Sequence, residues 1–121
     1  MKSHWMEHKG KRVLIAEYSN FNADSESLKK EANAIVEALL KEPRNSALVI
    51  SNVEGTNASL INAQVLMDVL PITNQFVHKR CVIGASGMGW SFIQSFNRLA
   101  GKAPIKPFHT LEEALDWVVE D

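Results

Sequence analysis

Two polar segments, each placed directly after a run of apolar residues, hold the side chains best suited to bind a ligand. One runs from Ser51 to Ser59, and the other reads Gly84-Ala85-Ser86-Gly87-Met88-Gly89. Hydroxyl and amide side chains can hydrogen-bond a ligand, and glycine lets the backbone approach one closely. The candidate ligand-binding residues are Ser51, Asn52, Thr56, Asn57, Ser86, Gly87, Trp90 and Ser91.

The glycine-rich segment is suited to an anion or a polar head group. A helix that begins after it would offer free N–H groups and positive dipole charge. The spacing is neither the dinucleotide fingerprint G-x-G-x-x-G nor a phosphate-binding loop, because no G-K-[ST] follows. The alternative interpretation is a tight turn, with Thr56 or Asn57 acting only as a helix cap. Trp90 and Met88 could cover an apolar tail.

Other chemistry has weaker support in the sequence. Thr56 and Ser59 are candidate phosphorylation sites, since a phosphate at a helix N-terminus is stabilised by the dipole. Cys81 lies in an apolar run, where thiols are normally inert. Ser86 could act as the nucleophile of a small hydrolase, although its surroundings do not read G-x-S-x-G. The four histidines are dispersed, no acid is obviously placed to orient one of them, and no metal-ligand spacing is present. No cofactor or metal is therefore expected.

Composition narrows the function classes further. The chain has 121 residues, 45% of them hydrophobic, which suits one globular domain over residues 1–121. The formal net charge is −1, so there is no bulk electrostatic case for nucleic-acid binding. One cysteine excludes an internal disulfide, and no apolar run is long enough to span a bilayer. These features predict a cytoplasmic protein without a transmembrane segment.

The elements that position the candidate residues alternate along the chain. Residues 4–8 predict a strand that turns at Lys9-Gly10-Lys11 into a second, buried strand from Arg12 to Tyr18. Further strands are expected at Ala47–Ile50, at Arg80–Gly84 and, at a sheet edge, at Ile105–Phe108.

Apolar residues at helical spacing predict four helices between and after these strands. The first begins at Asp24 or Ser25, buries a stripe and ends before Pro43. Its predicted stripe contains Leu28, Ala32, Ile35, Val36, Leu39 and Leu40. The second runs from Ala58 or Ser59 to Leu70, with a possible extra turn or two over Ile72–His78 beyond Pro71. The third carries Phe92, Ile93, Phe96 and Leu99 inward and ends at Gly101, and Thr110-Leu111-Glu112-Glu113 predicts a capping box for the last.

This order, β-β-α-β-α-β-α-β-α, predicts an α/β fold. A mainly parallel central sheet is expected, with helices on both faces and an antiparallel strand contributed by the N-terminal hairpin. Ligands of such sheets bind at the carboxyl ends of the strands, so the site is expected between residues 51–59 and 85–90. The second predicted helix carries more apolar residues than one stripe can bury, and Ile72, Phe76 and Val77 extend them. A symmetric homodimer through this region or the neighbouring helix is therefore expected.

The chain resembles the bacterial SpoIIAA-like proteins, a small and uncharacterised family of the STAS-like and CRAL-TRIO-like fold group. The resemblance rests on Lys79 to Gly87, on Phe96-Asn97-Arg98-Leu99-Ala100-Gly101 and on Pro107 to Trp117. In such proteins a basic residue leads into an apolar strand, a G-x-[ST]-G exit follows, and an aromatic-E-E-A-L-x-W segment closes the chain. The first half agrees in the order of its elements.

The resemblance implies a non-catalytic STAS-like module that binds a partner protein or a small anionic or amphiphilic ligand, including a lipid. An alternative is an anti-sigma factor antagonist controlled by phosphorylation. Those antagonists carry D-[ST]-x-G-[LIVM] at the start of the second helix, whereas this chain reads Thr56-Asn57-Ala58-Ser59-Leu60, without the aspartate and the glycine. A small serine hydrolase is the third hypothesis.

Overall fold

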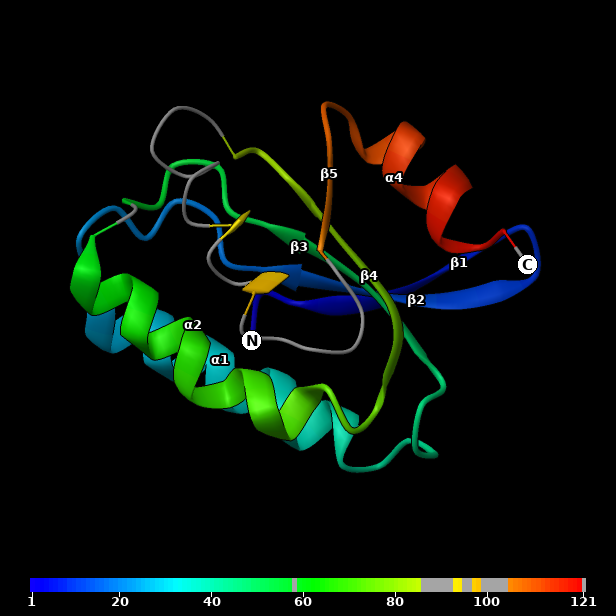
Figure 1. Cartoon of the computed structure of the whole chain (residues 1–121), viewed down its shortest axis with the longest axis horizontal. Helices are drawn as coiled ribbons and strands as arrows, with labels where there is room; N and C mark the ends of the chain where they lie inside the picture. Colours follow the sequence, from blue (N-terminus) through cyan, green and yellow to red (C-terminus); the bar gives the residue numbers. More distant parts are fainter. Residues whose placement is uncertain (58, 86–92, 95–96, 99–104, 121) are drawn as a thin grey trace.

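The fold is that of a computed structural model, which describes residues 1–57, 59–85, 93–94, 97–98 and 105–120. Its sheet has the strand order β1-β2-β3-β4-β5 (Figure 1). β1 pairs antiparallel with β2, and every other neighbouring pair is parallel. The predicted α/β fold with one antiparallel hairpin strand is thus confirmed. The strands are β1 (His4–His8), β2 (Lys11–Glu17), β3 (Ala47–Asn52), β4 (Val77–Ile83) and β5 (Lys106–Phe108).

The hairpin turn follows from two residues of positive φ. Lys9 has φ 50° and Gly10 has φ 82°, the left-handed pair that a two-residue hairpin of native twist requires. Glycine adopts this conformation without the steric penalty of a Cβ. The turn sets the register, with His8 opposite Lys11 and His4 opposite Ile15.

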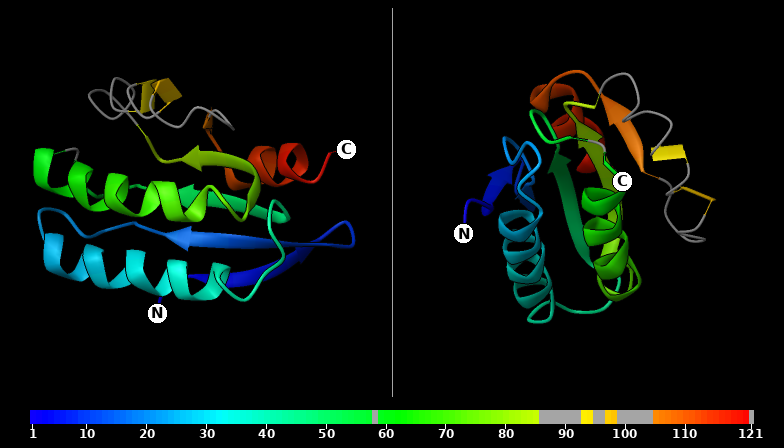
Figure 2. Two further views of the ribbon diagram at one scale, coloured as in Figure 1. Left: turned by 60° about the horizontal axis from the view of Figure 1, so that its bottom comes forward. Right: turned by 90° about the vertical axis from the view of Figure 1, so that its left-hand side faces the viewer.

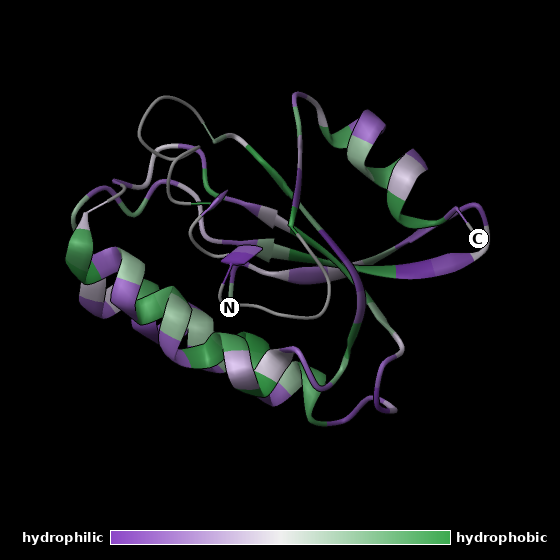
Figure 3. Ribbon diagram, viewed as in Figure 1, coloured by the Kyte–Doolittle hydropathy of each residue, from purple (hydrophilic) through white to green (hydrophobic). Residues whose placement is uncertain are grey.

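Helices cover both faces of the sheet (Figure 2). α1 (Ser25–Leu39) and α2 (Leu60–Thr73) lie side by side on one face, and α4 (Leu111–Val118) packs on β3, β4 and β5 from the other. α1 is amphipathic, as expected for a helix with one face on a sheet, whereas hydrophobic residues occur around much of α2 (Figure 3). Because successive side chains of a strand point to opposite faces of the sheet, the strands contribute to two separate hydrophobic cores.

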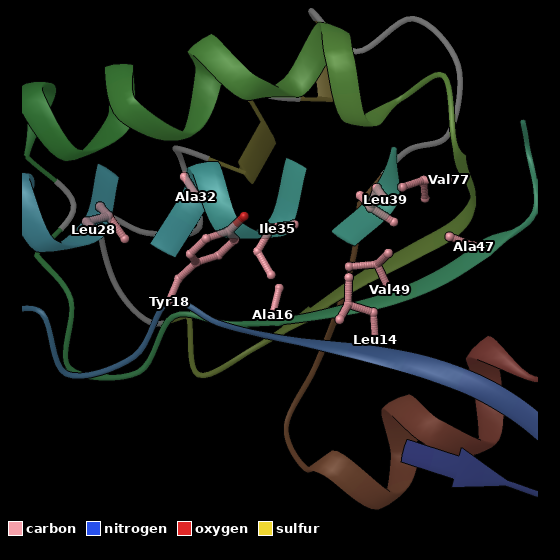
Figure 4. Close-up of a cluster of buried hydrophobic side chains, with 10 residues drawn as sticks. All are labelled: Leu14, Ala16, Tyr18, Leu28, Ala32, Ile35, Leu39, Ala47, Val49 and Val77. Carbon is pink, nitrogen blue, oxygen red and sulfur yellow. The ribbon is translucent and has the colours of Figure 1, made fainter. Parts of the chain in front are cut away.

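The larger core lies beneath α1 (Figure 4). It joins alternate residues of β2 to the inner face of α1, and its buried members are Leu14, Ala16, Tyr18, Leu28, Ala32, Ile35, Leu39, Ala47, Val49 and Val77. The second core joins the opposite faces of the strands to α4, and includes Val13, Ile15, Ile50, Cys81, Ala114 and Val118. Of the stripe predicted for the first helix, Val36 is only partly buried, and Leu40, which caps the helix at its C-terminus, is exposed.

Two local boundaries differ from the sequence prediction. Pro71 lies inside α2, which continues to Thr73, and the chain then turns through Asn74 so that β4 begins at Val77. The expected helical turn over Ile72–His78 is therefore wrong in its last residues. The cause is long-range pairing: the Ala47 N–H donates to the Phe76 carbonyl, and Val77 pairs with Ala47 in the parallel ladder.

The last predicted helix is confirmed, together with its cap. Thr110 accepts a hydrogen bond from the Glu113 backbone N–H, and its hydroxyl also lies 3.2 Å from the Glu113 carboxylate. Of the third predicted helix, residues 93–94 and 97–98 are helical, and its remaining residues lie outside the described part of the chain. Within the described residues, no helix is both long and apolar enough to cross a membrane.

Candidate ligand-binding pocket

A cavity of about 540 Å³ lies between the sheet and the helical layer. Its floor is formed by β3 and β4, its wall by the inner face of α2, and one end by the loop that follows β3. Most of the lining is aliphatic. The lining residues of the floor and wall include Val49, Val82, Ala63, Leu66, Val69 and Leu70, with Ile35 and Leu39 contributed by α1. Ile93 and Ile105 also line it.

The loop that follows β3 is fixed by hydrogen bonds to the loop that precedes α1. The Asn20 N–H donates to the Glu54 carbonyl at 2.7 Å, and the Asn22 N–H donates to the Gly55 carbonyl at 2.9 Å. Thr56 Oγ1 accepts from the Phe21 N–H and donates to the Tyr18 carbonyl. These contacts fix the shape of the loop.

Asn62, a residue that the sequence analysis did not select, joins three segments beside the cavity. It is 2% exposed, and its Nδ2 donates to the carbonyls of Asn22 and Asn57, each at 2.9 Å. Its Oδ1 accepts from the Ser25 hydroxyl at 2.6 Å. A polar residue in an apolar helical stretch was the only sequence signal for this role.

The structure brings part of the predicted site together. Ser51, Thr56 and Asn57 line the cavity, and so does Ser59, which caps α2 by accepting from the Asn62 N–H. Asn52 does not line the cavity; its amide contacts the Glu17 carboxylate and the Glu54 N–H. Ser86, Gly87, Trp90 and Ser91 lie outside the described residues.

Arg80, which lines the cavity, is a further polar residue that the sequence analysis missed. Arg80 is 8% exposed, and its Nη2 donates to Thr73 Oγ1 at 2.9 Å. Burial lowers the pKa of the guanidinium to about 10, so it still carries its charge at neutral pH. The sequence signal was an arginine directly before the apolar run Cys81-Val82-Ile83, which we interpreted as the basic residue that leads into the strand.

A register shift decides which face Arg80 occupies. Ala47 pairs with Val77, but the next residue, Leu48, pairs with Lys79, so His78 is an extra residue in β4. Because side chains alternate along a strand, this insertion places both Val77 and Arg80 on the α1–α2 face. Without it, Arg80 would face α4.

Tyr18, just beyond the end of β2, is another polar residue that lines the cavity. It is 7% exposed, and its ring rises from the sheet toward the helical layer (Figure 4). Burial raises the pKa of the hydroxyl, against the attraction of the nearby Arg80 charge, so the phenol stays protonated. Tyr18 therefore presents a neutral hydroxyl close to a buried cation.

Neither of two potentially reactive groups, Cys81 and His8, lines the cavity. Cys81 is fully buried in the core on the α4 face, and burial raises the pKa of its thiol to about 12, which keeps it protonated. The expectation that no acid orients a histidine is wrong for His8, whose Nε2 lies 2.8 Å from the Asp116 carboxylate. This pair joins the hairpin to α4 at the end of the sheet opposite the loop of Thr56, because His8 pairs with the first residue of β2.

Comparison with solved structures identifies the fold. The chain is similar to an uncharacterised protein of the DUF3478 family with a SpoIIAA-like fold, from Shewanella loihica PV-4. The similarity has a TM-score of 0.69 and covers 96% of this chain and 91% of that chain, at 14% sequence identity. This chain has a SpoIIAA-like fold. A scan against family models and a search of the curated proteins found no match.

The SpoIIAA-like fold agrees with the resemblance predicted from the second half of the sequence. At 14% identity the likeness shows the fold and no more.

Proposed function

We propose that the chain is a non-catalytic binding module that takes a small, largely apolar ligand into the cavity between β3, β4 and α2. The cavity itself carries this proposal. Protein interiors are close-packed, and voids larger than a water molecule are few. A space of about 540 Å³ falls instead within the range of small-molecule pockets, which are mostly apolar with a few placed polar groups.

The hydroxyl groups of Thr56 and Ser59, which line the cavity, favour binding over group transfer. Thr56 Oγ1 is engaged both as acceptor and as donor, so a phosphoryl transfer to it would have to break two hydrogen bonds. The Ser59 hydroxyl caps α2. The His8–Asp116 pair is at the opposite end of the sheet and cannot activate either hydroxyl.

The test is a pair of substitutions that add the same side chain inside and outside the cavity. Ala63 is 6% exposed and lines the cavity, whereas Glu37 is exposed on α1. In the native protein we expect saturable fluorescence enhancement of the neutral dye N-phenylnaphthylamine. Ala63→Met should abolish this enhancement, and Glu37→Met should leave it unchanged.

Thermal unfolding of the same variants gives an independent readout. Extra methylenes in a well-packed core typically cost about 1–3 kcal/mol, but a side chain that enters an existing space does not. We expect Ala63→Met to be at least as stable as the native protein. A clear loss of stability, together with no dye binding by the native protein, would overturn the proposal.

We also propose that α2 forms the contact of a symmetric dimer, as its wide apolar surface predicts. Ile61 is 67% exposed and Ile72 is 40% exposed, and their spacing of eleven residues places them on one side of the helix. Leu60 extends this surface with an exposure of 88%. These exposed apolar residues lie before and after the hydrogen-bonded pair Gln64–Asp68 along α2, and exposed apolar surface commonly marks an interface.

A further inference from the structure

Arg80 carries a buried charge whose pairing is incomplete. Within the described residues its side chain donates one hydrogen bond, to Thr73, and forms no ion pair with a carboxylate. A guanidinium has five N–H donors, and a buried charge without a counter-charge is costly. Thr73 is itself 4% exposed and is neutral, so it satisfies one donor and none of the charge.

The Tyr18 hydroxyl is also without a hydrogen-bond partner in the described part of the chain. Yet none of the described side-chain nitrogen and oxygen atoms is both fully buried and unpartnered. The remaining N–H groups of Arg80 and the Tyr18 hydroxyl are therefore open to the cavity that both residues line. The N–H groups that Arg80 does not donate to Thr73, the Tyr18 hydroxyl and one positive charge thus face a space whose other walls are mostly aliphatic.

We propose that Arg80 and Tyr18 bind the carboxylate of an amphiphilic monoanion, such as a fatty acid, whose apolar tail occupies the rest of the cavity. This inference rests on the proposed function of the cavity and adds the class of its ligand. A carboxylate matches the planar fork of a guanidinium with two parallel hydrogen bonds. Its single negative charge also balances the single buried cation. The tail would lie against Ala63, Leu66 and Leu70 on the inner face of α2.

The protonation states support this assignment over a wide pH range. Burial lowers the pKa of Arg80 to about 10, which keeps the group charged at neutral pH. Burial raises the pKa of Tyr18, so the hydroxyl keeps the proton that it donates. A neutral or cationic head group would leave the Arg80 charge unbalanced.

The experiment compares two ligands with the same tail, dodecanoate and dodecanol, by displacement of N-phenylnaphthylamine from the full chain. We expect dodecanoate to bind about tenfold more tightly or better, the size of effect for hydrogen bonds to a charged group. Arg80→Met keeps an unbranched apolar side chain and should remove this preference, with dodecanol binding unchanged. Tyr18→Phe, which keeps the ring, should weaken dodecanoate alone, by about threefold to tenfold for one hydrogen bond.

The outcomes separate this inference from the proposed function. If the dye and dodecanol bind but dodecanoate has no advantage, the carboxylate site is wrong and the apolar pocket stands. If the dye and both ligands fail to bind, the pocket itself is wrong. A preference for dodecyl phosphate over dodecanoate would overturn the choice of a carboxylate. If Arg80→Met does not fold, the proposal is tested by the preference of the native protein for dodecanoate over dodecanol and by the weaker dodecanoate binding expected for Tyr18→Phe.

Discussion

At the scale of single residues, Glu31 shows how a buried carboxylate fixes the start of the chain. It is 6% exposed on the face of α1 that meets the N-terminus. Its carboxylate accepts hydrogen bonds from the Lys2 N–H at 3.1 Å, the Ser3 N–H at 2.9 Å and the Ser3 hydroxyl at 2.6 Å. Ser3 Oγ in turn accepts from the Glu17 N–H at 2.8 Å. The residues before β1 are thereby tied to both α1 and β2.

These hydrogen bonds predict a pH-dependent contribution to stability. Burial raises the pKa of Glu31, but the hydrogen bonds from Ser3 and Lys2 outweigh burial and hold the pKa below its ordinary value. A carboxyl with a lowered folded-state pKa stabilises the fold above its unfolded-state pKa, 4.5 for a model glutamate. This stabilisation is lost as the pH falls through the lower folded-state value.

We therefore expect Glu31→Gln to lower the free energy of unfolding at pH 7 by about 1–3 kcal/mol, because one acceptor of buried donors is replaced by an NH₂ group. Urea denaturation measures this difference, and it should narrow as the pH falls below 4.5. The control is Glu37→Gln on the exposed face of α1, which should change stability by less than about 0.5 kcal/mol. Equal effects of the two substitutions would contradict this role of Glu31.

At the scale of elements, the end of β4 is held against the loop after β3. Gly84 has φ 81°, and a Cβ there would lie 2.7 Å from the Glu54 backbone nitrogen and 2.7 Å from Glu54 Cβ. The same loop closes one end of the cavity, and Gly84 lines it. The close approach of the two backbones thus fixes this end of the pocket.

Gly10 provides a matched control for this contact, because it has φ 82° with no atom within 4 Å of a built Cβ. Gly10→Ala should cost about 1–2 kcal/mol, the penalty of a left-handed conformation alone. Gly84→Ala adds a clash with backbone and should cost about 1–3 kcal/mol more, as overpacking does. Chemical denaturation of both variants gives the comparison. Similar losses at the two sites would show that the β3 loop moves away at little cost.

At the scale of the whole molecule, the two faces of the sheet are covered unequally. α1 and α2 form a continuous layer on one face, whereas within the described residues the other face carries α4 (Figure 2). α4 is held by side chains from the strands: Lys79 Nζ donates to the Trp117 carbonyl at 2.7 Å and lies 4.2 Å from the centre of its ring. The exposed apolar side chains of α2 lie on the outer side of the layer that α1 and α2 form.

The expected cytoplasmic location stays a prediction.

The dimer proposal is tested by sedimentation velocity at high micromolar concentration. We expect a dimer for the native chain and a monomer for Ile61→Lys, because a charge would be buried at the centre of the contact. Leu40→Lys is the control, since Leu40 is 52% exposed at the end of α1 and outside the proposed contact. A native chain that sediments as a monomer, or a dimer unaffected by Ile61→Lys, would contradict the proposal.

The sequence by itself determined those features that depend on neighbours along the chain. The hairpin follows from the positive φ values at Lys9 and Gly10, and α4 begins at Thr110 because its hydroxyl caps the Glu113 N–H. The order of strands and helices follows from apolar periodicity, and right-handed crossovers then leave few topologies. The same reasoning placed Ser51 and Thr56 beside a common end of the sheet, where both line the cavity.

Only the tertiary structure decided which polar groups the cavity contains. Arg80 faces it because β4 accommodates one extra residue at His78, and pairing with β3 sets that shift rather than any local preference of the chain. Glu31 is buried because a segment 28 residues away supplies its donors. The cavity exists because the inner faces of β3, β4 and α2 do not fill the space between them, and that depends on packing among distant side chains.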